Sequence, residues 1–163
     1  IKRMELFGLE LSKEKTRILP FGRYSGSRET FDFLGFTHFN SKTRKGYYTV
    51  GHKISRKKKK QFKSNLKKWV KENRNTQFDE FMKALNKKLT GSFNYYSLSG
   101  MIKEVRNLWH HSLYVTFKWI NRRSQRRSFK LERFCEIWND RIIHPYIHVD
   151  IWSGDKVIYN KNV

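Results

Sequence analysis

The sequence has one cysteine, few acidic residues and no long apolar run, and each shortage excludes a class of protein. Cys135 alone cannot form an internal disulfide or a multi-cysteine zinc site, and a single cysteine fits a reducing compartment. Cys135 itself is expected to be a small core residue. No stretch of roughly 18 apolar residues occurs, so no transmembrane helix is expected. The chain has 14 Asp and Glu residues, and no pair has the spacing of a two-metal catalytic site. A glycine-rich nucleotide-binding loop of the Walker type is also absent.

Basic residues dominate what is present. The chain has 36 Lys and Arg residues and a formal net charge of +22. Because like charges repel one another in a compact state, a polyanionic partner is expected. Nucleic acid is the leading candidate, and an anionic membrane surface is the alternative. Aromatic residues make up 16% of the chain, and their large buried area favours a folded core.

The first third of the chain is rich in Gly, Thr, Phe and Tyr and reads as strands and turns. Strands are expected at residues 16–21, 30–39 and 46–50, with Asp32 facing solvent within the second. Together they predict a small antiparallel sheet that ends near residue 54.

The remainder is rich in Lys, Leu, Asn and Trp and reads as helices. Ser55 is expected to cap the first helix, and Thr76 with Asp79 resembles a capping box at the start of the second. Gly91 is expected to interrupt or tighten that second helix, and a short fourth helix is expected from Leu131 to Asp140. The fold class predicted is therefore α+β, with a small antiparallel sheet followed by an antiparallel bundle of three to four helices.

Two basic clusters are the candidate nucleic-acid-binding sites. Residues 53–74 contain eleven Lys or Arg residues and one acid, Glu72. Such a run is often only a solvated helix face, but this one lacks the Glu partners that usually balance it. The second cluster, at residues 122–127, offers arginine forks for phosphate oxygens, or alternatively charges for a helix end. The candidate residues are Arg56, Lys57, Lys58, Lys59, Lys60, Lys63, Lys67, Arg122, Arg123, Arg126 and Arg127.

Aromatic residues near the second cluster and the six histidines are also candidates for functional roles. Trp119, Phe129 and Phe134 could stack on unpaired bases, but at helical spacing they fit a core better. No metal site is expected from the six histidines. His110 and His111 point about 100° apart on a helix, and Pro145 breaks the helix that would be needed to pair His144 with His148.

Several segments in order resemble the group II intron reverse transcriptases. Gly8–Ile18 is similar to their sixth sequence block, and Phe31–Phe36, with the sequence FDFLGF, is similar to their seventh. Leu89–Gly100 and Trp119–Arg126 resemble the maturase-specific thumb region, also called domain X. The match covers roughly residues 1–140.

The resemblance implies a role for each part of the chain. Residues 1–54 would be the end of the reverse transcriptase palm, residues 55–140 the helical thumb or maturase domain X, and residues 141–163 a C-terminal extension. The implied function is the nucleic-acid-binding portion of an RNA-directed DNA polymerase and splicing maturase, located in a bacterial cytoplasm or an organelle. Its partners would be intron RNA, an RNA/DNA template–primer duplex and the finger and palm segments of the same polypeptide, with no membrane.

The resemblance also implies site residues. Lys15 would donate a proton to the leaving pyrophosphate or position the nucleotide, although it could simply face solvent or pair with a nearby acid. Phe33, Leu34 and Gly35 would form the primer grip, although Phe33, Leu34 and Phe36 could be plain core, with Gly35 allowing close approach of another backbone. The family's Tyr-Ala-Asp-Asp block is absent and should precede residue 1. Mg²⁺ is therefore expected at upstream palm carboxylates, and this chain itself should bind no cofactor and not polymerise alone.

Two alternatives remain open. One is a stand-alone RNA-binding or maturase module without polymerase activity. The other is the thumb of a reverse transcriptase associated with CRISPR or phage defence, because such enzymes share these blocks.

Overall fold

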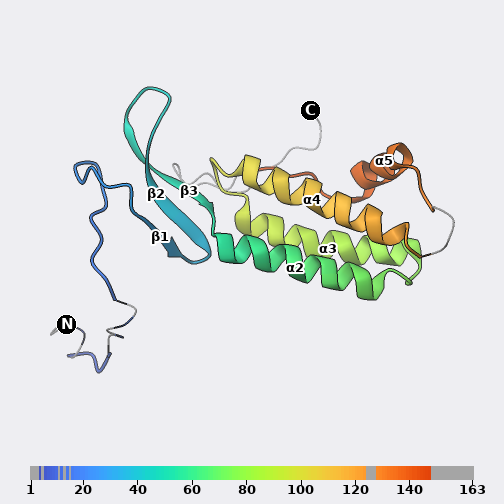
Figure 1. Cartoon of the computed structure of the whole chain (residues 1–163), viewed down its shortest axis with the longest axis horizontal. Helices are drawn as coiled ribbons and strands as arrows, with labels where there is room; N and C mark the ends of the chain where they lie inside the picture. Colours follow the sequence, from blue (N-terminus) through green and yellow to red (C-terminus); the bar gives the residue numbers. More distant parts are fainter. Residues whose placement is uncertain are drawn as a thin grey trace. The chain divides into compact units, whose positions relative to one another are not determined.

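The computed structural model describes residues 4, 6–10, 12, 14, 16–123 and 128–147. Three strands come first: β1 (Thr30–Phe33), β2 (Phe36–Lys42) and β3 (Tyr48–Ile54). Four helices follow: α2 (Arg56–Asn73), α3 (Phe78–Tyr96), α4 (Ile102–Ile120) and α5 (Leu131–Arg141) (Figure 1). The predicted α+β class is confirmed, with a three-stranded antiparallel sheet in the order β1-β2-β3.

The chain divides into two compact units. The first, which we call the hairpin unit, comprises Ile1–Phe31 and His38–Gly51. The second, the helical unit, comprises Asp32–Thr37 and His52–Val163. The turn between β1 and β2 and the last residues of β3, His52–Ile54, thus belong to the helical unit.

Two strand predictions were wrong. The strand expected at residues 30–39 is split by a two-residue turn in which Leu34 and Gly35 both have positive φ, 49° and 85°. Paired positive φ values match the twist of antiparallel hairpins, and Gly adopts such a conformation without steric cost. The strand expected at residues 16–21 does not form, and Ile18 is 99% exposed. The third strand forms but begins at Tyr48 and extends to Ile54.

In the hairpin unit, the chain reverses between β2 and β3 through residues 43–47. Thr43 and Tyr47 are joined by a backbone hydrogen bond of 2.8 Å. Further along the ladder, the ring of Phe39 covers Gly51, and a Cβ added there would lie 2.5 Å from the ring. Gly51 is therefore required by packing, because any side chain would displace Phe39.

The predicted cap of α2 is confirmed, but that of α3 is wrong. Ser55 caps α2, and its side chain accepts a hydrogen bond from the backbone N–H of Lys58 at 3.4 Å. Helix α3 begins instead after Gln77, which makes no side-chain cap bond, and Asp79 forms an ion pair with Arg141 on α5. Gly91 does not interrupt α3, which continues to Tyr96.

The helices form an up-down-up bundle, in which α2 and α4 run parallel and α3 runs in the opposite direction (Figure 1). Trp69 of α2 stacks on Phe81 of α3 with ring centroids 5.4 Å apart. Helix α5 closes the core through Phe134 and Trp138, which are both fully buried. Ile142 and Ile143, just after α5, also contribute to this core, because Ile142 is buried and the Ile143 carbonyl accepts a hydrogen bond from the Trp109 indole.

The turn Asp32–Thr37 is held against the ends of two helices. Phe36 is buried and stacks on Tyr95, with ring centroids 5.5 Å apart. The Gly35 carbonyl accepts a hydrogen bond of 2.9 Å from the backbone N–H of Ser55. The Tyr95 hydroxyl donates to the Leu34 carbonyl. These contacts fix the turn to the N-terminal end of α2 and the C-terminal end of α3.

Within the described residues, no helix is both long enough and apolar enough to cross a lipid bilayer.

Candidate nucleic-acid interface

Six cations lie along one side of α2 and define what we call the basic stripe. They follow one another at steps of three or four residues, which is the repeat of a single helix face. At about 1.5 Å of rise per residue, the stripe extends over roughly 27 Å. Its members are Arg56, Lys60, Lys63, Lys67, Lys71 and Arg74.

The stripe differs from the predicted cluster at its N-terminal end. The four consecutive lysines at 57–60 are spread around the helix at about 100° per residue, so they cannot share a face. Lys59 forms an ion pair of 2.5 Å with Glu104 of α4, a partner far away in sequence. Among the described residues, by contrast, the stripe cations have no carboxylate within ion-pair distance. The positive charge of the stripe is therefore not balanced internally.

The C-terminal end of the stripe meets the second predicted cluster at Trp119. The Arg122 guanidinium lies 5.2 Å from the centroid of the indole ring, that of Arg74 lies 5.4 Å away, and the Lys71 ammonium lies 5.9 Å away. Since α2 and α4 run parallel, their C-terminal ends lie together and bring these residues into one group. We call this group the Trp119 cluster.

The sequence prediction missed this convergence. Lys71 and Arg74 were counted in the basic run but not chosen as site residues, and Trp119 was assigned to bases or core. One signal was present, since Lys71 and Arg74 continue the spacing of the stripe. The pairing of α2 with α4 in parallel, however, depends on tertiary packing that the spacing does not contain.

Hydrogen bonds hold the described residues on either side of the arginine segment. The Asn121 side chain accepts a hydrogen bond of 2.9 Å from the backbone N–H of Phe129 and donates one of 3.1 Å to its carbonyl. Arg123 donates to the Thr76 carbonyl at 3.4 Å. Arg126 and Arg127 lie outside the described residues, as does Lys15.

The predicted primer-grip residues lie at the β1–β2 turn. Phe33 and Leu34 are 60% and 68% exposed, so the alternative that they are plain core is wrong for both. Phe36 alone of the three apolar residues is buried. For Gly35, the expected close approach is to a side chain, since the Lys58 stem lies 3.4 Å from the position of an added Cβ. The β1–β2 turn therefore exposes the apolar side chains of Phe33 and Leu34, while hydrogen bonds fix its backbone.

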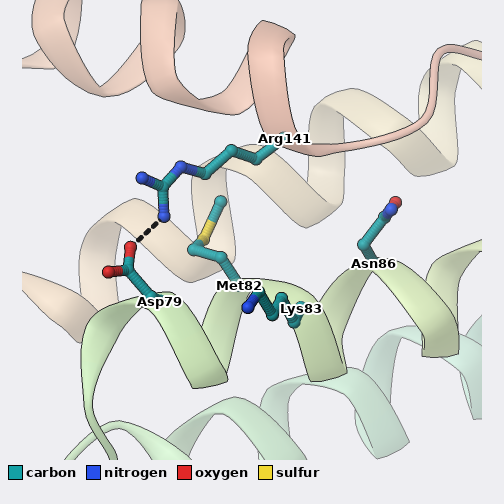
Figure 2. Close-up of a pocket in the computed structure, with 5 residues that line it drawn as sticks. All are labelled: Asp79, Met82, Lys83, Asn86 and Arg141. Atoms are coloured by element: carbon teal, nitrogen blue, oxygen red, sulfur yellow. Dashed lines mark hydrogen bonds and ion pairs between the residues drawn. The ribbon is translucent and has the colours of Figure 1, made fainter.

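A separate cleft of about 280 Å³ lies between α3 and α5. Figure 2 shows Asp79, Met82, Lys83 and Asn86 on α3 facing Arg141, which pairs with Asp79 across the opening. This ion pair lowers the pKa of the Asp79 carboxyl below its usual range. Asn86 has a structural task, because its side-chain oxygen accepts a hydrogen bond from the Ile143 backbone at 2.9 Å. The polar residues of the cleft therefore link α5 and the segment after it to α3.

In the described part of the chain, no three His, Cys, Asp or Glu side chains lie close enough together to hold a metal ion. His144 instead stacks on Trp109 at 5.5 Å, and His110 meets the same ring edge-on at 5.0 Å.

His111, on the side of α4 that is near Lys63 of the stripe, is expected to make the stability of the helical unit depend on pH. Burial lowers the pKa of His111 below 6.5, and the nearby charge of Lys63 lowers it further. The folded state therefore favours neutral His111, and its contribution to stability is complete above the unfolded pKa and is lost as the pH falls below it. We expect His111→Gln to flatten the fall in the free energy of unfolding between about pH 7 and pH 5. Urea unfolding at several pH values measures this, and an unchanged slope in the variant would refute it.

The comparison with known protein families finds a match, and it lies within the helical unit. Residues 59–135 match the family model described as "Group II intron, maturase-specific domain". No curated protein and no solved structure matches the chain. The matched segment contains most of α2, all of α3 and α4, and the start of α5. It therefore includes five of the six stripe cations, all except Arg56, together with Trp119 and Arg122. Residues 59–135, just under half of the chain, are therefore similar to the group II intron maturase-specific domain, and this match supports a relation to the group II intron maturases.

Proposed function

We propose that the helical unit binds group II intron RNA through the basic stripe and the Trp119 cluster, and thereby serves as a splicing maturase. The observation that supports this most directly is that all of these cations except Arg56 lie within the segment that matches the maturase-specific domain, on one side of α2 and without acidic partners among the described residues. Phosphate contacts supply most of the affinity of such surfaces. An A-form helix is recognised mainly through its shape, phosphates and 2′-hydroxyls, which a straight row of cations can follow.

Binding to RNA by this surface has a measurable signature. If six to eight cations contact phosphates, the slope of log K against log salt should be roughly −4 to −7. Filter binding of the purified chain to a folded group II intron transcript, a tRNA, duplex DNA and anionic vesicles measures this across salt. The proposal requires the steep slope and a preference for the intron transcript. A slope near zero with RNA would sink it, and stronger binding to vesicles than to any RNA would favour the membrane alternative.

We further propose that the β1–β2 turn contacts a primer–template duplex in a longer reverse transcriptase. The exposed Phe33 and Leu34, held on a backbone fixed by Ser55 and Tyr95, support this. Mg²⁺ and the polymerase carboxylates would then come from the palm of the longer polypeptide. Primer extension by such a protein, with Leu34→Ser compared with wild type, tests the proposal. A loss of primer extension with intron RNA binding unchanged is expected, and unchanged extension would contradict it.

A further inference from the structure

Three cations surround the ring of one uncharged residue, Trp119, in the described part of the helical unit. Lys71 and Arg74 approach its ring from α2, and Arg122 approaches from the end of α4. Three other described rings of this unit lie near a single cation each: Lys88 over Trp69, Lys118 over Tyr114 and Arg141 over Phe78.

We propose that Trp119 is a positioning residue that assembles Lys71, Arg74 and Arg122 into a single phosphate-binding site for RNA. The proposal deepens the proposed function, on which it rests, by naming where an RNA phosphate is held most firmly. The ligand is a backbone phosphate and not a base, because cations occupy positions over the ring.

Electrostatics explains why the site would be incomplete without an anion. Three cations within 6 Å of one ring centroid repel one another, and no described carboxylate lies within ion-pair distance of them. The negative face of the indole offsets part of that repulsion, and it orders otherwise flexible side chains before the ligand arrives. Two of the three are arginines, whose planar forks can each hold two phosphate oxygens.

A purely structural role for the cluster makes a different prediction. Cations near the C-terminal ends of α2 and α4 also interact favourably with the helix dipoles. If that were their whole role, removing the ring would lower stability without changing how RNA binding depends on salt. Evenly distributed surface charge likewise predicts no effect, because replacing Trp119 by Leu removes no charge.

The decisive comparison is Trp119→Leu against Tyr114→Leu in the purified chain. Tyr114 lies on the same helix, is 60% exposed and has one cation, Lys118, 6.0 Å from its ring centroid. With the folded intron transcript as the probe, Trp119→Leu should weaken binding roughly 10-fold and make the salt slope shallower by about 1 to 2. Tyr114→Leu should leave the slope unchanged. Trp119→Phe, which keeps a weaker aromatic face, should give an intermediate result.

A double-mutant cycle gives an answer even if Trp119→Leu unfolds the chain. Arg74→Gln and Arg122→Gln should be non-additive in RNA affinity, because each loss disrupts the same phosphate site. Arg74→Gln combined with Lys88→Gln, which removes an equal charge from a single-cation ring, should be additive. A folded Trp119→Leu protein with an unchanged salt slope would overturn the proposal, as would additivity in the Arg74–Arg122 cycle. If instead the wild-type chain shows no steep salt slope with RNA, the proposed function itself has failed.

Discussion

Replacing Arg56, Lys60, Lys67 and Lys71 together by Gln is expected to weaken RNA binding by roughly 10²–10³-fold at moderate salt. Each of these side chains lies on the basic stripe and has no acidic partner among the described residues. The salt slope should become shallower by about 3 to 4, since each lost phosphate contact removes close to one unit. Filter binding over a range of salt concentrations measures both quantities.

The control removes equal charge from another surface. Lys83, Lys87 and Lys88 on α3 and Lys130 before α5 are exposed and lie outside the stripe. Replacing these four by Gln should change RNA affinity much less than the stripe variant does. If both variants lose affinity equally, net charge and not the stripe controls binding. Lys59 is left unchanged in both, because removing it would leave Glu104 without its ion-pair partner.

Trp138→Ala is expected to destabilise the helical unit by about 3–5 kcal/mol, a large part of the 5–15 kcal/mol that stabilises a typical domain. Trp138 is fully buried on α5 and packs against Trp109 and Phe134, with ring centroids 5.9 Å and 6.0 Å away. Truncation would leave a cavity beneath α5 that the rigid rings around it cannot fill. Urea unfolding followed by circular dichroism measures the loss.

Leu131→Ala on the same helix is the matched comparison. Leu131 is 53% exposed, so its truncation should cost about 0.5 kcal/mol or less. Equal effects of Trp138→Ala and Leu131→Ala would mean that α5 is not part of the cooperative core.

The helices were predictable from the sequence because periodicity and local capping determine them. The Ser55 cap and the apolar positions of α2 and α4 needed only the spacing of residues along one helix. The Thr76 prediction was wrong for a related reason. The local pattern of a capping box was present, but Asp79 instead pairs with Arg141, 62 residues away.

The site was less predictable because its geometry is tertiary. Counting charges identified α2 as basic, yet it could not show that Lys59 would be paired with Glu104 or that Lys71 and Arg74 would meet Arg122. The apolar residues of the β1–β2 turn posed the opposite difficulty. Alternation suggested one continuous strand, whereas positive φ at Leu34 and Gly35 reverses the chain there and exposes Phe33.

The division of the β2–β3 hairpin between the two units has a consequence for how this protein tolerates changes in length. The backbone hydrogen bond from Ser55 to Gly35 and the one from Thr43 to Tyr47 fit the same strand register. The pairing of β2 with β3 therefore keeps one register along its whole length. Phe36 and Ile54 are buried in the core of the helical unit, whereas residues 38–51 belong to the hairpin unit. Cross-strand pairs can therefore be inserted or deleted near the tip without changing Phe36 or Ile54. Relatives of this chain should differ in length most freely between residues 40 and 50, and this segment is the most suitable place to insert a tag or a second domain.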